Sequence, residues 1–236
     1  MQFKVPLQRG KLLKRYKRFL ADVTLDTGEF VTAACPNTGA MLGLKTPGAV
    51  VYLSRSDSKT RKYPHTLEIV ERPDFGLIGI NTAHPNNLFE EALNNKLLPD
   101  LQSYPTIRRE VKYGTNSRID LLLQGNELPD CYIEVKNVTL YRQPSHAEFP
   151  DCVTERGTKH LHELSNMVKQ GHRAIMAYVI QGGGAQDFSL TADLDPKYVE
   201  AFRRATSQGV EAMALTCHVS PDRIAIEGMV PILDLQ

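Results

Sequence analysis

The chain has 236 residues, of which 42% are hydrophobic and 23% are charged, an ordinary composition for a globular protein. Its formal net charge is only +1, so the overall charge alone predicts no nucleic-acid partner. No run approaches about 18 uninterrupted apolar residues, and the N-terminus lacks the apolar core of a signal peptide, so we expect no membrane association. The four cysteines form no CxxC pair, which favours free thiols and a cytoplasmic location.

Basic residues are unevenly distributed along the chain. Seven of them lie between Lys4 and Arg18 with no acid among them, and four more lie between Arg55 and Lys62 beside the single acid Asp57. This asymmetry predicts a basic surface for phosphates, with interleaved aromatic residues as stacking groups. A solvated basic strand at a sheet edge is the alternative. The candidate DNA-binding residues are Lys11, Lys14, Arg15, Lys17, Arg18, Arg61, Lys62 and Arg118.

The first eighty residues have the pattern of about five short strands separated by turn residues. Five strands with tight connections fit a small barrel of the OB type. Such barrels commonly bind single strands or oligosaccharides, although a fold alone does not decide function. The strands are expected over residues 11–25, 29–34, 49–53, 62–71 and 76–81.

A polar stretch over residues 81–87 predicts a linker, so we expect domains over residues 1–83 and 84–236. Beyond it, helical and strand patterns alternate as in a mixed sheet flanked by helices. The predicted fold class is therefore α+β with two domains, an N-terminal OB-like small β-barrel and a C-terminal mixed α/β domain. The expected helices cover residues 88–97, 153–171 and 196–209, and the expected strands cover residues 107–112, 119–123, 132–140, 173–180 and 210–219.

Two neighbouring strand-like segments carry charges where a buried strand should be apolar. Asp120 lies in the first, and Glu134 and Lys136 interleave with apolar residues in the second. Strand side chains alternate with period two, so Glu134 and Lys136 project from the same face. Burying a carboxylate costs several kcal/mol unless a partner or a metal offsets it. The pattern predicts a catalytic or metal-binding trio, with a structural ion pair as the alternative.

The chemistry of this trio is that of phosphodiester hydrolysis. Asp120 and Glu134 offer the hard oxygen ligands that suit Mg²⁺ or Mn²⁺, and the main-chain carbonyl of Val135 offers another. Lys136 would orient the attacking water or stabilise the transition state. Glu110 is a candidate extra catalytic acid, with an exposed strand carboxylate as the alternative. His160, near the start of the next helix, either faces the same cleft or belongs to a solvated helix surface.

The turn Pro36-Asn37-Thr38-Gly39 has two interpretations. As structure, it is a tight connection in which glycine supplies a positive φ. As function, its amides and the Thr38 hydroxyl hold a phosphate. The sequence physics favours the structural interpretation.

Six longer motifs stand in a fixed order: CPNTGAM at 35–41, RKYPHT at 61–66, EVKYG at 110–114, SRID at 117–120, EVKNVTL at 134–140 and FPDCVTERG at 149–157. Together they resemble the sugar fermentation stimulation protein A (SfsA) family over residues 7–231. The resemblance implies an N-terminal OB-like domain, a C-terminal PD-(D/E)xK-type domain and non-specific DNA binding, with a regulatory link to sugar (maltose) metabolism. Two positions depart from the family pattern: Cys152 stands where alanine is usual, and Leu121 where phenylalanine often follows the aspartate.

Three functions remain as hypotheses. The first is a cytoplasmic DNA-binding protein that grips backbone phosphates without strong sequence preference. The second, compatible with it, is a DNA endonuclease that uses Mg²⁺ or Mn²⁺ at the acidic trio. The third is an RNA-binding or sugar-binding module in which the carboxylates only stabilise the fold.

Overall fold

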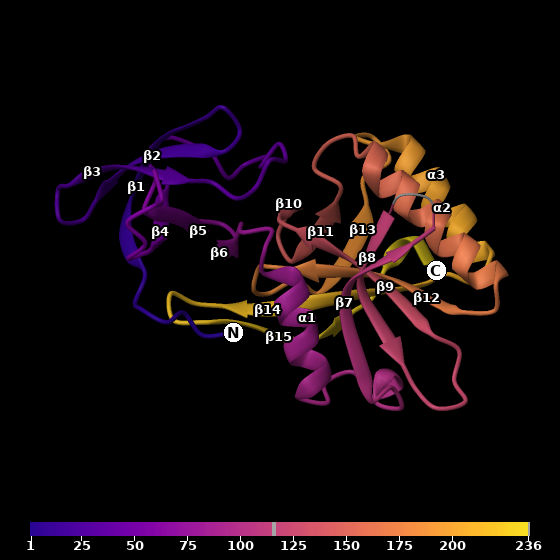
Figure 1. Ribbon diagram of the computed structural model, residues 1–236. Helices are drawn as coiled ribbons and strands as arrows, with labels where there is room; N and C mark the ends of the chain where they lie inside the picture. The colour runs from indigo at the N-terminus through magenta and orange to yellow at the C-terminus, as the bar shows by residue number, and fades with distance from the viewer. Residues whose placement is uncertain (115–116, 236) are drawn as a thin grey trace.

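The structure, a computed structural model, describes residues 1–114 and 117–235. The N-terminal strands form a barrel that lies beside a mixed sheet flanked by helices (Figure 1). This arrangement confirms the predicted fold class. None of the helices in the described ranges is long and apolar enough to span a membrane.

The N-terminal sheet contains six strands in the order β3-β2-β1-β4-β5-β6. A short parallel pairing of β3 with β5, Ala33 with His65 and Ala34 with Thr66, closes the five strands β1 to β5 into a barrel, and β6 pairs with β5 outside this ring. The barrel interior holds alternate apolar side chains such as Leu12, Val23 and Leu53. The strands are β1 (Gln8–Tyr16), β2 (Leu20–Leu25), β3 (Phe30–Ala34), β4 (Val50–Arg55), β5 (His65–Arg72) and β6 (Gly76–Gly79).

The expected single strand over residues 11–25 is wrong. The chain reverses at residues 17–19, so that β1 and β2 form an antiparallel hairpin. Lys17 and Arg18 adopt left-handed backbone conformations with φ of 50° and 66°. Such turns usually contain Gly, Asn or Asp, and this one contains none, so the composition gave no turn signal.

The C-terminal part is built around a six-stranded mixed sheet in the order β15-β14-β12-β9-β8-β7. Strands β9, β12 and β14 are parallel, and the outer strands are antiparallel. The strands of this sheet are β7 (Thr106–Tyr113), β8 (Ser117–Gln124), β9 (Cys131–Val138), β12 (Arg173–Ile180), β14 (Glu211–Val219) and β15 (Ile224–Val230). The helices are α1 (Pro85–Asn94), α2 (Glu155–Lys169) and α3 (Pro196–Ser207), with 3-10 turns η1 (Pro99–Leu101) and η2 (Leu233–Leu235).

Helices cover both faces of this sheet (Figure 1). The central strand β12 shows why: Ile175 and Val179 pack in the same apolar cluster as α1, whereas Met176 and Tyr178 pack with α2 and α3. A strand buried on both faces must be apolar at successive positions rather than alternately, which is the pattern of residues 173–180.

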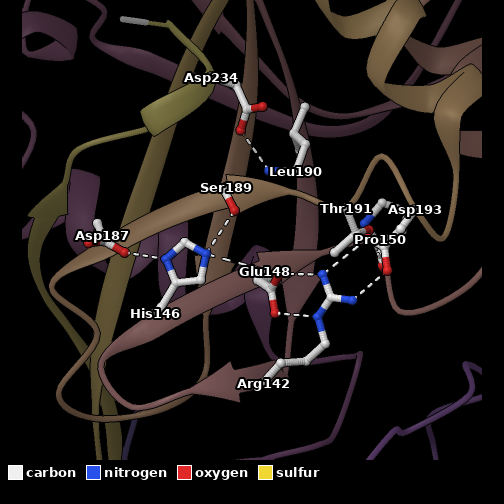
Figure 2. A network of polar contacts seen from close by, with 10 residues as sticks. All are labelled: Arg142, His146, Glu148, Pro150, Asp187, Ser189, Leu190, Thr191, Asp193 and Asp234. Carbon is white, nitrogen blue, oxygen red and sulfur yellow. Dashed lines mark hydrogen bonds and ion pairs between the residues drawn. The ribbon is translucent and has the colours of Figure 1, made fainter.

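A small third sheet, which the sequence did not predict, consists of β10 (Leu140–Gln143), β11 (His146–Phe149) and β13 (Asp187–Leu190). Polar side chains join its strands (Figure 2). Arg142 donates to Glu148 at 2.6 and 2.8 Å and to Asp193 at 2.5 Å. His146 contacts Asp187 and, at 2.8 Å, Ser189. These contacts fix the segment that leads into α2.

The barrel and the C-terminal part are directly bonded to each other. The Gly79 amide donates to the Gln181 carbonyl at 2.7 Å, and the Gln181 side chain donates to the Asn81 carbonyl at 3.0 Å. At a second place, the Met41 amide of the N-terminal part donates to the Asp151 carboxylate of the C-terminal part at 2.7 Å. The position of the barrel relative to the mixed sheet is therefore fixed at two separate places.

Candidate metal centre and nucleic-acid interface

The candidate trio lies where β8 and β9 separate. The two strands pair from Leu123–Cys131 to Leu121–Ile133. Beyond the Leu121–Ile133 pair, the Val135 amide donates to the Asp120 carboxylate at 2.8 Å instead of to a backbone carbonyl of β8. The other Asp120 oxygen accepts the side-chain amide of Asn86, in the first turn of α1, at 2.9 Å. The strands thus open at the point where the acidic side chains stand.

Glu134 is 3% exposed and faces α2. One of its oxygens, Oε1, accepts the Lys136 ammonium at 2.7 Å and also contacts His160 Nδ1. Lys136 Nζ is itself 3.2 Å from His160 Nδ1. The structure therefore brings Asp120, Glu134, Val135 and Lys136 into one hollow, with His160 as a buried member of the same group.

The second oxygen of Glu134, Oε2, is buried without a hydrogen-bond partner among the described residues. A buried, unpartnered carboxylate oxygen costs free energy unless an ion or water satisfies it. A second carboxylate, that of Asp120, lines the same hollow.

The two carboxyl groups have opposite pKa shifts. Burial and the neighbouring Glu134 raise the pKa of Asp120 above its ordinary value. Burial would also raise the pKa of Glu134, but Lys136 and His160 together outweigh it and the net pKa is lowered. The lowered pKa keeps Glu134 ionised. Burial and the negative charge of Glu134 both disfavour ionisation of Asp120.

This donor set suits a hard divalent cation. No group of three or more His, Cys, Asp or Glu side chains converges on one point in the described part of the chain. Mg²⁺ does not need such a cage, because it is usually held by one or two carboxylates together with waters and substrate phosphates. Asp120 and the unpartnered Oε2 of Glu134, in a hollow that Val135 also lines, meet that requirement.

Glu110 lies on β7, the next strand outward. The neighbouring register pairs are Arg109–Leu121 and Val111–Ile119, which places Glu110 opposite Asp120. Its φ of 52° is left-handed and its side chain is exposed. It lines a second hollow together with Arg118 and Arg156, so its assignment as a catalytic acid stays a prediction.

The predicted DNA-binding residues have different surroundings. Arg15 Nη2 donates to the carbonyls of Arg18, Asn37 and Gly39 at 2.7, 2.7 and 3.0 Å, so it holds backbone in place. Lys14 lies on the barrel surface, 3.5 Å from Asp22. Arg18 lines the groove between the barrel and the C-terminal part. The others are exposed: Lys11, Lys17, Arg61, Lys62 and Arg118.

One residue at the site, Asn86, is not marked by the sequence. It lies inside the stretch predicted to be a linker, and nothing in its spacing marks it as a partner of Asp120. Arg156 is a basic candidate beside the trio from the sequence, with an ordinary surface arginine as the alternative. In the structure it donates towards His160 Nε2 at 3.4 Å and lines the same hollow as Lys136.

Comparison with known proteins agrees with this architecture. The sequence profile "SfsA N-terminal OB domain" matches residues 13–80, and the profile "Sugar fermentation stimulation protein RE domain" matches residues 83–223. The sugar fermentation stimulation protein homologs of Brucella ovis and Brucella canis are each 54% identical to this chain over 236 residues, 100% of this chain and 99% of the relative. The solved SfsA structure of Pyrococcus furiosus is 27% identical, with a TM-score of 0.88 over 98% of this chain and 97% of that one. The chain belongs to the sugar fermentation stimulation protein family.

Proposed function

We propose that this protein binds DNA through backbone contacts without strong sequence preference, and that it hydrolyses phosphodiester bonds with a Mg²⁺ or Mn²⁺ ion held by Asp120 and Glu134. The observation that carries the proposal is the buried, unpartnered Oε2 of Glu134 among the described residues, in a hollow shared with Asp120 and Lys136. A purely structural ion pair would need only Oε1, which already accepts Lys136.

The Pyrococcus furiosus relative supports the choice of ion, because its structure was solved in complex with Ca²⁺. Ca²⁺ and Mg²⁺ both prefer oxygen ligands, although they differ in size and coordination number. When bound, such an ion would acidify a water molecule and neutralise negative charge on the phosphate.

The side chains of this chain have separate roles in that reaction. Lys136 places a positive charge beside Glu134, where it would stabilise negative charge that develops on the phosphate. His160 fixes Glu134 from α2, and Asn86 fixes Asp120 from α1. Because both carboxylates are held from rigid helices, their orientation does not depend on a mobile loop.

DNA binding in this proposal uses the exposed basic residues of the barrel, such as Lys11, Lys14 and Lys17, with Arg15 as the residue that orders the turn between β1 and β2. A role in regulating sugar (maltose) metabolism remains an expectation of the family relationship.

A cleavage assay tests the proposal. Wild type should nick plasmid DNA or cut single strands with Mg²⁺ or Mn²⁺, whereas Asp120→Asn should lose at least about 100-fold in rate because a ligand of the ion is gone. Lys136→Ala should lower kcat without abolishing ion binding. Asp57→Asn is the matched control, because Asp57 begins another acid-x-Lys triplet but is exposed. Cleavage that persists in Asp120→Asn would refute the assignment.

A further inference from the structure

The candidate metal centre borders two other hollows. It shares Thr82 and Asn137 with a groove of about 340 Å³ between the barrel and the C-terminal part. It also shares Arg156 and His160 with a hollow of about 430 Å³ that contains Arg118. The metal centre is therefore adjacent to both other hollows, and the three together are called the track.

We propose that this track holds one strand of single-stranded DNA, with the groove between barrel and C-terminal part taking the nucleotide next to the bond that is cut. This inference rests on the proposed function and deepens it, because it names the form of DNA that the site accepts.

The groove has a wall on each side. Arg18 and residues 37–39 of the barrel form one wall, and Asn137, Thr139 and residues 151–154 form the other. Pockets of about 300–1,000 Å³ hold ligands of drug size, and one nucleotide belongs to that class. A duplex segment occupies more volume than one nucleotide, so we expect a groove of about 340 Å³ with a wall on each side to admit a single strand.

The charges along the track suit a phosphate backbone. Arg18 stands in the groove. Arg118, Arg156 and Lys159 line the second hollow and outnumber its one acid, Glu110. The two acids of the groove are engaged in the fold. Glu148 is paired with Arg142 at 2.6 Å, and Asp151 accepts the Met41 amide at 2.7 Å.

The barrel wall is held rigidly against the other wall. Arg15 bonds the carbonyls of Arg18, Asn37 and Gly39, and the Asn37 side chain accepts the Gly39 amide at 2.9 Å. A Cβ on Gly39 would lie 3.0 Å from an Asp151 oxygen, so the two walls meet closely there. Gly39 is not among the glycines with a positive φ, so the predicted reason for this glycine is wrong, and the close approach of Asp151 constrains the position instead. The bonds that Arg15 donates hold the chain so that Arg18 lines the groove. Phe19, 50% exposed and next to Arg18, is a candidate platform for stacking a base.

Cys152 provides a direct probe, because it lines the groove. All four cysteines lie in the described residues; Cys35, Cys131 and Cys217 are buried, and Cys152 is partly exposed. The rate at which N-ethylmaleimide alkylates Cys152 is measured by mass spectrometry in EDTA, so that no DNA is cut. A single-stranded oligonucleotide at about ten times its Kd should slow alkylation about tenfold, because only the free protein reacts. A blunt duplex of the same length, at equal occupancy by fluorescence anisotropy, should leave the rate unchanged.

The inference is overturned if the single strand fails to protect Cys152 at saturation, or if the duplex protects it equally well. Its failure is distinguishable from that of the proposed function. Protection of Cys152 without any metal-dependent cleavage would retain the strand track and remove the nuclease reaction. Cleavage that depends on Asp120, without protection of Cys152, would retain the nuclease reaction and remove the strand track.

The variant Arg18→Gln tests the charge argument without relying on cleavage. It should weaken single-strand binding several-fold and reduce the slope of log K against log salt by about 0.7, the value expected for a single phosphate. Arg203→Gln on the exposed side of α3 is the matched control and should change neither quantity. Equal binding by wild type and Arg18→Gln would show that Arg18 touches no phosphate, against the proposed track.

Discussion

The two oxygens of the Glu134 carboxylate have unlike surroundings: Oε1 contacts Lys136 and His160, whereas Oε2 is buried with no partner in the described part of the chain. Lys136 therefore has a structural role besides any catalytic one. A buried carboxylate that loses its cation is strongly destabilised, because desolvation is no longer offset.

At the residue scale, we expect Lys136→Met to destabilise the protein. The free energy of unfolding should fall by about 3 kcal/mol, measured by urea denaturation at pH 7. Lys112→Met, in the corresponding position of the exposed Glu110-Val111-Lys112 triplet, should stay within about 0.5 kcal/mol of wild type. Equal losses in the two variants would mean that the Glu134–Lys136 pair contributes nothing to the fold.

A second residue-scale prediction concerns Glu68, a buried carboxylate of the barrel. It accepts Ser54 at 2.6 Å, Asn81 at 2.8 Å and His84 at 2.8 Å. Burial raises the pKa of Glu68, but His84 and Ser54 outweigh it, and the net pKa lies below the ordinary value of 4.5. The carboxylate therefore stabilises the fold above its unfolded pKa, and that contribution is lost as the pH falls through the folded value.

The measurement for Glu68 is the pH dependence of unfolding. Wild type should be more stable than Glu68→Gln at pH 7, and the difference should shrink as the pH is lowered below about 4.5, where the unfolded side chain becomes protonated. A difference that is constant from pH 7 to pH 3 would contradict the assignment.

At the element scale, the hairpin of β1 and β2 depends on Arg15. Its three bonds to carbonyls hold a turn in which Lys17 and Arg18 have left-handed conformations. Arg15→Ala should lower the free energy of unfolding by about 2 kcal/mol, because the hydrogen bonds that its charged group donates are removed. Lys14→Ala should lower it by less than about 1 kcal/mol, since its pair with Asp22 is on the surface. Similar decreases in urea denaturation would refute the special role of Arg15.

The elements that the sequence predicted are those with strong periodicity. The strand over residues 173–180 and the helices near Leu161 and Phe202 follow their apolar patterns closely. The turn at residues 17–19 could not be predicted, because side chains elsewhere, not turn residues, stabilise it. The four-residue strands β11 and β13 are too short to show a period, and long-range polar contacts hold them (Figure 2).

The candidate site was predictable in part for the same reason. Asp120, Glu134 and Lys136 break the apolar pattern of two adjacent strands, so the sequence marks them. Asn86 carries no such mark, because only the tertiary fold brings α1 to Asp120. The basic run marks Arg18 as a DNA-binding candidate, but its place in the groove depends on the tertiary fold. The boundary between residues 83 and 84 remains a prediction.

At the scale of the whole molecule, the barrel and the C-terminal part act on one strand of DNA in this account. Replacing Lys11, Lys14 and Lys17 together by alanine should weaken binding to unrelated single strands about equally and lower the salt slope by about 0.7 for each phosphate that is no longer neutralised. Band-shift titrations at several salt concentrations measure this, with Lys169→Ala on α2 as the control. Weaker binding to one sequence alone would contradict backbone recognition.

The most direct test of the central claim is calorimetric titration of Mn²⁺ into the protein without DNA. Wild type and Asp57→Asn should bind one ion with the same affinity, and Asp120→Asn and Glu134→Gln should each bind it at least about tenfold more weakly, a loss of about 1.4 kcal/mol. Binding of equal strength in all four proteins, or none in wild type, would contradict a metal centre at Asp120 and Glu134.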